Sequence, residues 1–307
     1  MPPLRAEALT FGDHYEKALG NVVLPPFLKW ITTGKRFNKS IAGVRFPSTL
    51  IGIRLGHHFN QSLVGVAFPA SLKTITFGCF YNKSLVGVSW NSGLQTILLG
   101  KQFDKPLSAV VWPRDLKLLS LGVDFNQPFA EDVTWPEGLE ILLLSREFNQ
   151  PISCGRWPSS LKLLEFGRFN QTLQHASLPP QLEVCMGIFC EWDGSTEIYL
   201  PVGLYMGDHW DYPLTTVSLP ERLVDLDLGN GFDQPLDEVV FPSGLVVLSI
   251  GNSFDHPIFD VKWPRHLTTV RFGDKFAQSL DGVIWPPDLK NAYFGKSMNT
   301  EDVYEAD

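Results

Sequence analysis

Residues 72–82 read Leu-Lys-Thr-Ile-Thr-Phe-Gly-Cys-Phe-Tyr-Asn, and this stretch decides the fold. Ile75 and Phe77 alternate with Thr74 and Thr76. Successive side chains of a β-strand point to opposite faces, so the two apolar residues are expected to face inward and the two threonines outward. The stretch therefore predicts a short strand with one buried face, ended by a glycine turn.

The same phrase returns about every 22 residues along nearly the whole chain. In general form it reads L-x-x-L-x-L/F-G-x-x-F-N-Q/K-P/S-L/I-x-x-V-x-W/F-P. A fixed period of roughly 20–29 residues with L-x-x-L-x-L is typical of a leucine-rich-type solenoid, in which each repeat packs only on its neighbours. The aromatic residue of the F-N pair, or its replacement, falls at Tyr15, Phe37, Phe59, Tyr81, Phe103, Phe125, Phe148, Phe169, Trp210, Phe232, Phe254, Phe276 and Met298, with a degenerate copy at Trp192.

Equivalent strands of successive turns must run parallel, because each coil returns with the same hand. Trp-Pro or Phe-Pro pairs such as Trp112-Pro113 recur on the return limb, where proline fixes an extended backbone and removes a donor. We therefore predict a mainly β repeat solenoid over residues 1–307, with about 14 repeats of about 22 residues. One strand per repeat should build a parallel sheet on one face, with turns and extended segments on the other.

Two small or polar positions of the repeat have structural explanations. Gly78 and its counterparts stand where the backbone either turns with a positive φ or passes too close to a neighbour for a Cβ atom. The asparagine after the aromatic residue can hydrogen-bond backbone groups of adjacent coils. Because this structural asparagine belongs to four N-x-S/T sequons, glycosylation there would disrupt the coil: Asn38, Asn60, Asn82 and Asn170.

The phrase resembles the FNIP repeat, a relative of the leucine-rich repeat named for its Phe-Asn-Ile-Pro core. The resemblance covers almost the whole chain, although Ser62 replaces the family's proline in an early copy and Trp-Pro often replaces its Leu-Pro. It implies a solenoid and protein–protein interaction, and it implies no reaction, so we expect no enzyme activity and no cofactor. Close matches are Phe125-Asn126-Gln127-Pro128, Phe148-Asn149-Gln150-Pro151-Ile152, Phe232-Asp233-Gln234-Pro235-Leu236 and Phe254-Asp255-His256-Pro257-Ile258.

The net charge of −8 conceals an asymmetry. Residues 1–125 hold 14 Lys and Arg against 6 Asp and Glu, whereas residues 126–307 hold 11 against 27. In a solenoid, sequence order is spatial order, so this distribution predicts a charge dipole along the axis. A continuous basic track for nucleic acid is disfavoured. No segment is long and apolar enough to span a membrane, and residues 1–5 lack the apolar region of a signal peptide, so we expect a cytoplasmic protein.

The outward strand positions form the predicted binding face for another protein. In the middle repeats they become apolar, and a contiguous exposed apolar strip with a polar rim usually marks an interface. The alternative is that a bent neighbouring segment covers some of them. The predicted partner-binding residues are Leu98, Leu118, Ile141, Leu143, Leu163, Glu165, Asp225 and Asp227, and Val184 and Met186 would extend the strip.

The regular spacing fails at about residues 182–212, which makes this break a second candidate site. It is either a degenerate repeat that kinks the solenoid or a functional site. Cys185 and Cys190 allow a disulfide, or a metal site with His209 and an acid, but their C-x4-C spacing lies outside the common C-x2-C pattern and we expect no metal. Cys79 and Cys154 are read as buried free thiols. The candidate residues of the break are Cys185, Cys190, Trp192, His209 and Trp210.

Three other functions remain as alternatives. Uncapped strand edges and the charge dipole favour head-to-tail self-assembly. An array of threonines, which includes Thr74 and Thr96, weakly suggests a carbohydrate- or ice-binding surface. Asp225 and Asp227 lie on one side of one strand at a separation of roughly 7 Å, which is within the range of inverting glycosidases, but we interpret the pair as a solvated acidic patch. The sequence contains no H-E-x-x-H, Walker A, G-x-S-x-G or G-x-G-x-x-G motif.

Overall fold

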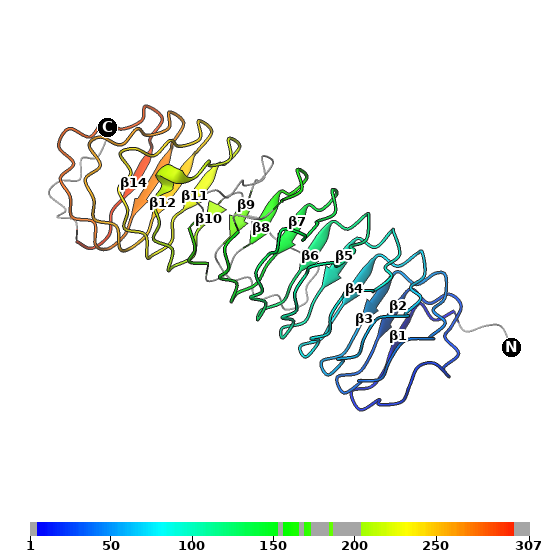
Figure 1. Ribbon diagram of the computed structural model, residues 1–307. Helices are drawn as coiled ribbons and strands as arrows, with labels where there is room; N and C mark the ends of the chain where they lie inside the picture. Colours follow the sequence, from blue (N-terminus) through cyan, green and yellow to red (C-terminus); the bar gives the residue numbers. More distant parts are fainter. Residues whose placement is uncertain (1–4, 153–155, 166–168, 173–183, 187–203, 298–307) are drawn as a thin grey trace. The chain divides into compact units, whose positions relative to one another are not determined.

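The computed structural model describes residues 5–152, 156–165, 169–172, 184–186 and 204–297. The chain divides into two compact units, residues 1–148 with 154–161 and residues 149–153 with 162–307. These are the N-terminal and C-terminal units below. Each unit is a stack of coils, and each coil contributes one short strand that lies beside the strand of the next coil (Figure 1).

The strands of each unit follow one another in sequence order and pair in parallel. The N-terminal unit holds β1 (Ala8–Thr10), β2 (Trp30–Thr32), β3 (Gly52–Arg54), β4 (Thr74–Thr76), β5 (Thr96–Leu98), β6 (Leu118–Ser120) and β7 (Ile141–Leu143). The C-terminal unit holds β8 (Leu163–Glu165), β9 (Val184–Met186), β10 (Leu204–Tyr205), β11 (Asp225–Asp227), β12 (Val247–Ile250), β13 (Thr269–Phe272) and β14 (Asn291–Tyr293).

The register confirms the sequence period. Ile53 pairs with Ile75, and Leu226 pairs with Leu248, so each residue lies beside the residue one repeat away. The predicted solenoid with one strand per repeat is therefore correct. Of the expected 14 or so turns, ten run from strand to strand wholly within the described residues, six in the N-terminal unit and four in the C-terminal unit. The degenerate copy at Trp192 lies outside the described residues.

The core is a column of inward side chains that runs along each unit. Ile75 is fully buried and Phe77 is 5% exposed, as the strand alternation predicts, whereas Thr74 and Thr76 are half-buried on the outward side. The aromatic residues of the F-N position stack ring over ring, with Phe37 to Phe59 at 6.1 Å between centroids and 3° between planes. Because such a stack adds aromatic contact to apolar burial at every turn, it supplies much of the packing of the fold.

The glycine after most of the described strands is required by close approach rather than by φ, whereas Ser145 takes this place after β7. A Cβ atom on Gly100 would lie 1.8 Å from the carbonyl oxygen of Gly78, and one on Gly251 would lie 1.8 Å from that of Gly229. Among these glycines only Gly122 and Gly229 also have a positive φ, at 86° and 76°. The two explanations that the sequence left open therefore both apply, with steric exclusion the general one.

The return limb consists of turns and extended segments, as predicted. The carbonyl of its proline accepts a hydrogen bond from the residue three places on, as in Leu72 N to Pro69 O at 3.0 Å. The one described helix is a short 3-10 turn at Leu214–Thr216. No helix in the described ranges is long and apolar enough to cross a membrane. One expectation is corrected: Cys79 is a free thiol but is half-buried, not buried, while Cys154 lies outside the described residues.

Candidate functional site: the outward strand face

The outward face of the N-terminal unit brings most of the predicted apolar strip together. Leu118 pairs with Ile141, and Ser120 pairs with both Leu98 and Leu143. Adjacent strands lie about 4.8 Å apart, so these side chains form a continuous ladder across β5, β6 and β7. Leu118, Ile141 and Leu143 are half-buried and remain accessible to a partner.

Two predicted members of the strip are not exposed. Leu98 is 9% exposed and Leu163 is 2% exposed, so neither offers much surface to a partner. Leu163 pairs with Val184 in the C-terminal unit. The side chains of Glu165, Val184 and Met186 lie outside what the structure describes. The accessible apolar surface is therefore centred on Leu118, Ile141 and Leu143.

The sequence reading missed an aromatic–cation pair on the same face. A Cβ atom on Gly52 would lie 2.1 Å from the ring of Trp30, so the indole occupies the space where residue 52 lacks a side chain. The guanidinium carbon of Arg54 lies 5.5 Å from the Trp30 ring centroid, within reach of a cation–π interaction. A glycine at an outward strand position beside a tryptophan one period earlier was the signal for this arrangement. The pair also interrupts the threonine array between Thr32 and Thr74.

In the C-terminal unit, Asp225 and Asp227 occupy the outward positions of β11. Both are half-buried, and Asp227 Oδ1 accepts a hydrogen bond of 2.8 Å from the N–H of Gly229. Burial is the main cause that raises the pKa of Asp227, and the charge of Asp208 raises it further. The Gly229 N–H and the charge of Arg271 act in the opposite direction. The carboxylate of Asp227 is thus held by its own turn.

Among the described residues of the break, Met206 and Trp210 are buried in the core. Trp210 is 0% exposed, and its ring stacks on Phe232 at 5.6 Å, in the position that phenylalanine holds in other turns. Its Nε1 donates a hydrogen bond of 3.2 Å to the carbonyl of Gln171. His209 is exposed on the turn. Cys190, Trp192 and the side chain of Cys185 lie outside the described residues, and within the described ranges no group of three or more His, Cys, Asp or Glu is arranged to hold a metal ion.

A polar ladder follows the turn edge of each unit and confirms the predicted role of the asparagine. In the N-terminal unit, the Oδ1 of Asn60 accepts the N–H of Asn82 at 3.0 Å, and the Oδ1 of Asn82 accepts the N–H of Asp104 at 3.1 Å. Three sequon asparagines therefore serve as backbone acceptors: Asn38, Asn60 and Asn82.

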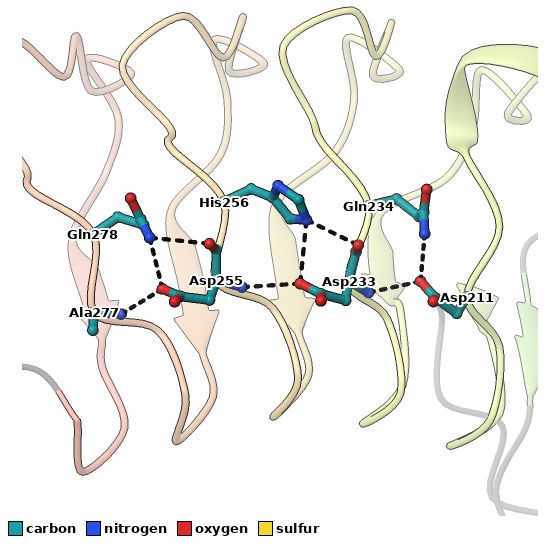
Figure 2. Close-up of polar contacts among 7 residues, drawn as sticks. All are labelled: Asp211, Asp233, Gln234, Asp255, His256, Ala277 and Gln278. Atoms are coloured by element: carbon teal, nitrogen blue, oxygen red, sulfur yellow. Dashed lines mark hydrogen bonds and ion pairs between the residues drawn. The ribbon is translucent and has the colours of Figure 1, made fainter.

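In the C-terminal unit the same ladder is built from carboxylates (Figure 2). Oδ1 of Asp211, Asp233 and Asp255 accepts the N–H of the next turn at 2.9, 3.2 and 3.0 Å. The hydrogen bond from Gln278 is the main cause that lowers the pKa of Asp255, followed by the bond from the N–H of Ala277. His256 takes the place of the glutamine in its turn, with Nε2 at 2.9 Å from the Asp233 carbonyl and 3.2 Å from its carboxylate.

Comparisons with known proteins agree with this architecture. The model of the FNIP Repeat family matches residues 37–80, 125–169, 148–185 and 210–253. The solved structure of CroV588, described as a novel circular LRR protein, is 27% identical, with a TM-score of 0.68. The match covers 95% of this chain, which spans 47% of the CroV588 chain.

Two further solved structures match most of this chain at low similarity. The pneumococcal vaccine antigen PcpA is 17% identical, with a TM-score of 0.28 over 94% of this chain and 78% of that chain. A leucine-rich cell surface protein from Faecalibacterium prausnitzii is 12% identical, with a TM-score of 0.22 over 94% and 88%. No curated protein matches the sequence at a significant level.

Proposed function

Because the chain is built of FNIP repeats on a leucine-rich-repeat-like solenoid, we propose that it is a non-enzymatic scaffold that binds another protein through its outward strand face. One observation supports the proposal most: Leu118, Ile141 and Leu143 form a half-buried apolar ladder in register on the adjacent strands β6 and β7. Nucleic acid and membrane are not proposed as partners.

The surroundings of the ladder support a protein partner. Ser120 and Thr96 lie beside it and provide hydroxyl groups at its rim. On the same face, Trp30 and Arg54 present two residue types that often dominate binding energy. An apolar centre with polar neighbours suits a protein segment that inserts apolar side chains between the rows.

The test is a comparison of two variants in the same unit. Leu118→Asp with Ile141→Asp places charge in the ladder, whereas Val111→Asp alters a residue of the extended return limb that is 75% exposed. A photo-crosslinking side chain at Leu143 would identify the bound protein in a cell extract. We expect the ladder variant to reduce its recovery by about tenfold or more and the return-limb variant to retain it. Equal recovery with both folded variants would reject the strand face as the binding surface.

A second candidate is end-to-end association of copies of this chain. The observation that favours it is the likeness to the circular CroV588 chain, of which one copy of this chain spans 47%. Two copies joined head to tail would supply about the length of that circle. Light scattering after size exclusion tests this candidate, because an assembly of two would have twice the mass of the 34.4 kDa chain. A single mass of 34.4 kDa at every concentration would exclude it.

A further inference from the structure

At one glycine of the repeat, no described residue approaches the space that the missing side chain leaves. At the strand-end position, a Cβ atom would lie 1.8 to 2.4 Å from the carbonyl oxygen of the preceding turn's glycine in nine turns. At Gly12, which begins the series, a Cβ would meet nothing within 4 Å, and φ is not in the left-handed region. The space that glycine keeps open in these nine turns is therefore open at Gly12 as well, but no described residue fills it. The nine glycines are Gly34, Gly56, Gly78, Gly100, Gly122, Gly229, Gly251, Gly273 and Gly295.

The first and last described strands also leave core positions uncovered. Within the described part of the chain, β1 pairs only with β2, and β14 pairs only with β13. Leu9 and Tyr15 are half-buried, whereas their counterparts one turn later, Ile31 and Phe37, are 1% and 0% exposed. At the other end, Ala292 and Phe294 are half-buried, against 0% and 5% for Val270 and Phe272. Among the described residues, both edges thus present apolar surface and strand groups that no other strand pairs.

We propose that the β14 edge of one copy pairs with the β1 edge of a second copy in the register of the solenoid. This inference rests on the end-to-end candidate function and specifies its interface. Asn291, Ala292 and Tyr293 would pair with Ala8, Leu9 and Thr10, as each strand pairs with the next inside the chain. The carbonyl of Gly295 then occupies the space at Gly12, and Phe294 covers Phe11.

Charge supports this register specifically. Inside the chain, Lys29 bonds Glu7 at 2.9 Å and Lys35 bonds Asp13 at 3.1 Å, each across one turn. At the junction, the same positions place Lys290 opposite Glu7 and Lys296 opposite Asp13. Two lysines on one edge therefore meet two carboxylates on the other.

The distribution of acids agrees with this pairing. The segment of residues 1–125, which has a net positive charge, contains only six acids. Three of them lie in the first turn: Glu7, Asp13 and Glu16. Most of the acidic excess of the second half precedes β12, because residues 126–244 hold 18 acids against 5 bases and residues 245–297 hold 5 against 6, while residues 298–307 add four acids and no base. Local pairs, rather than the predicted axial dipole, would join the ends.

The first test is Gly12→Ala in the full chain. The added Cβ meets nothing within the copy, so folding should be unchanged, but it would collide with the Gly295 carbonyl across the junction. We expect the dissociation constant of the self-association to rise by about tenfold or more. Light scattering over a concentration series measures it. The matched control is Gly20→Ala, which also has open space, and whose counterparts Ala42, Val64 and Val86 carry side chains. Equal association of both variants would overturn the proposal.

The second test reverses charges. Glu7→Lys with Asp13→Lys should prevent self-association, and so should Lys290→Glu with Lys296→Glu. A mixture of the two variants should assemble, because the β1 edge of the first then carries lysines and the β14 edge of the second carries glutamates. A control with Glu131→Lys and Asp132→Lys makes the same charge change on an exposed turn away from both edges. Wild-type self-association that is insensitive to all these changes would reject this interface and leave the end-to-end candidate open to another contact. A wild-type monomer at all concentrations would reject both.

Discussion

Tyr81 holds a position that phenylalanine occupies in the flanking turns. Its ring stacks at 6.1 Å on Phe59 and at 6.3 Å on Phe103, and its side chain is 0% exposed. The hydroxyl has no hydrogen-bond partner among the described residues. Burial also raises the pKa of Tyr81, so the hydroxyl stays protonated. An unpaired buried hydroxyl costs about 1–3 kcal/mol relative to its hydrated state.

We therefore expect Tyr81→Phe to stabilise the protein by about 1 kcal/mol, because the ring stack is kept and the unpaired group is removed. Urea unfolding measures the change. Tyr15→Phe is the control, since Tyr15 has the same place in the first turn but is half-buried, and its effect should be close to zero. A loss of stability in Tyr81→Phe would show that the hydroxyl is paired in solution.

Asp227 gives a pH-dependent prediction. Its folded-state pKa is raised above the ordinary value of 3.8, chiefly by burial, so the fold penalises the ionised form. This penalty is absent below pH 3.8, where Asp227 is protonated in both the folded and the unfolded state. It is complete above the raised pKa of the folded state. Asp227→Asn should therefore be more stable than wild type at neutral pH, and the difference should vanish as pH falls below 3.8.

Asp255→Asn provides the opposite sign in the same unfolding experiment. The pKa of Asp255 is lowered, chiefly by the hydrogen bond from Gln278, so its ionised form is favoured in the fold. The stabilisation that ionised Asp255 contributes is present above pH 3.8 and is lost as pH falls through the lowered pKa. The asparagine variant should therefore be less stable than wild type at neutral pH. Equal pH profiles for the two variants would contradict both assignments.

At the scale of the element, the ladder of side-chain acceptors holds successive turns together. The Oδ1 of Asn60 accepts the N–H of Asn82 at 3.0 Å, and Asn60→Ala would leave that backbone donor without its partner. We expect a loss of about 1–3 kcal/mol in the free energy of unfolding. Asn60→Asp should retain most of it, because Asp104 performs the same function in the same unit at 3.0 Å to Asn126 N. An alanine variant as stable as wild type would show that water replaces the acceptor.

Much of this element could be predicted from the sequence. The period alone identified the strand positions, the inward Ile75 and Phe77, and the asparagine that bonds across turns, because each is a property of one residue and its copy. The sequence left open whether some strip residues are covered, but it did not identify Leu98 and Leu163 as the buried ones, and it did not predict the Trp30 ring over Gly52. The alternation of a strand states only which face of the sheet a residue occupies. The exposure of a side chain on that face also depends on the packing of its neighbours, which the alternation does not specify.

At the scale of the whole molecule, a repeat array is least protected at its ends, because a terminal turn has one neighbour where an interior turn has two. In dilute solution, the amides of β1 and β14 should exchange with deuterium faster than those of β4. If copies join through these edges, exchange of both edges should slow as concentration rises, while β4 is unchanged. Slowing at only one of the two edges would contradict head-to-tail pairing, which is heterologous and uses both.

The contacts between regular turns are offset by one period, and this has a genetic consequence. The Asn/Asp ladder, the stack of aromatic rings and the glycine–carbonyl contacts each join a turn to the adjacent turn at equivalent positions, so regular interior turns are interchangeable. Removal of residues 61–82 would join Asn60 to Lys83 and rebuild the phrase Phe-Asn-Lys-Ser without altering any type of contact. Recombination between neighbouring repeats can therefore lengthen or shorten the array in whole turns. Such a change would keep the β1 and β14 edges but would alter the distance between the partners that bind there.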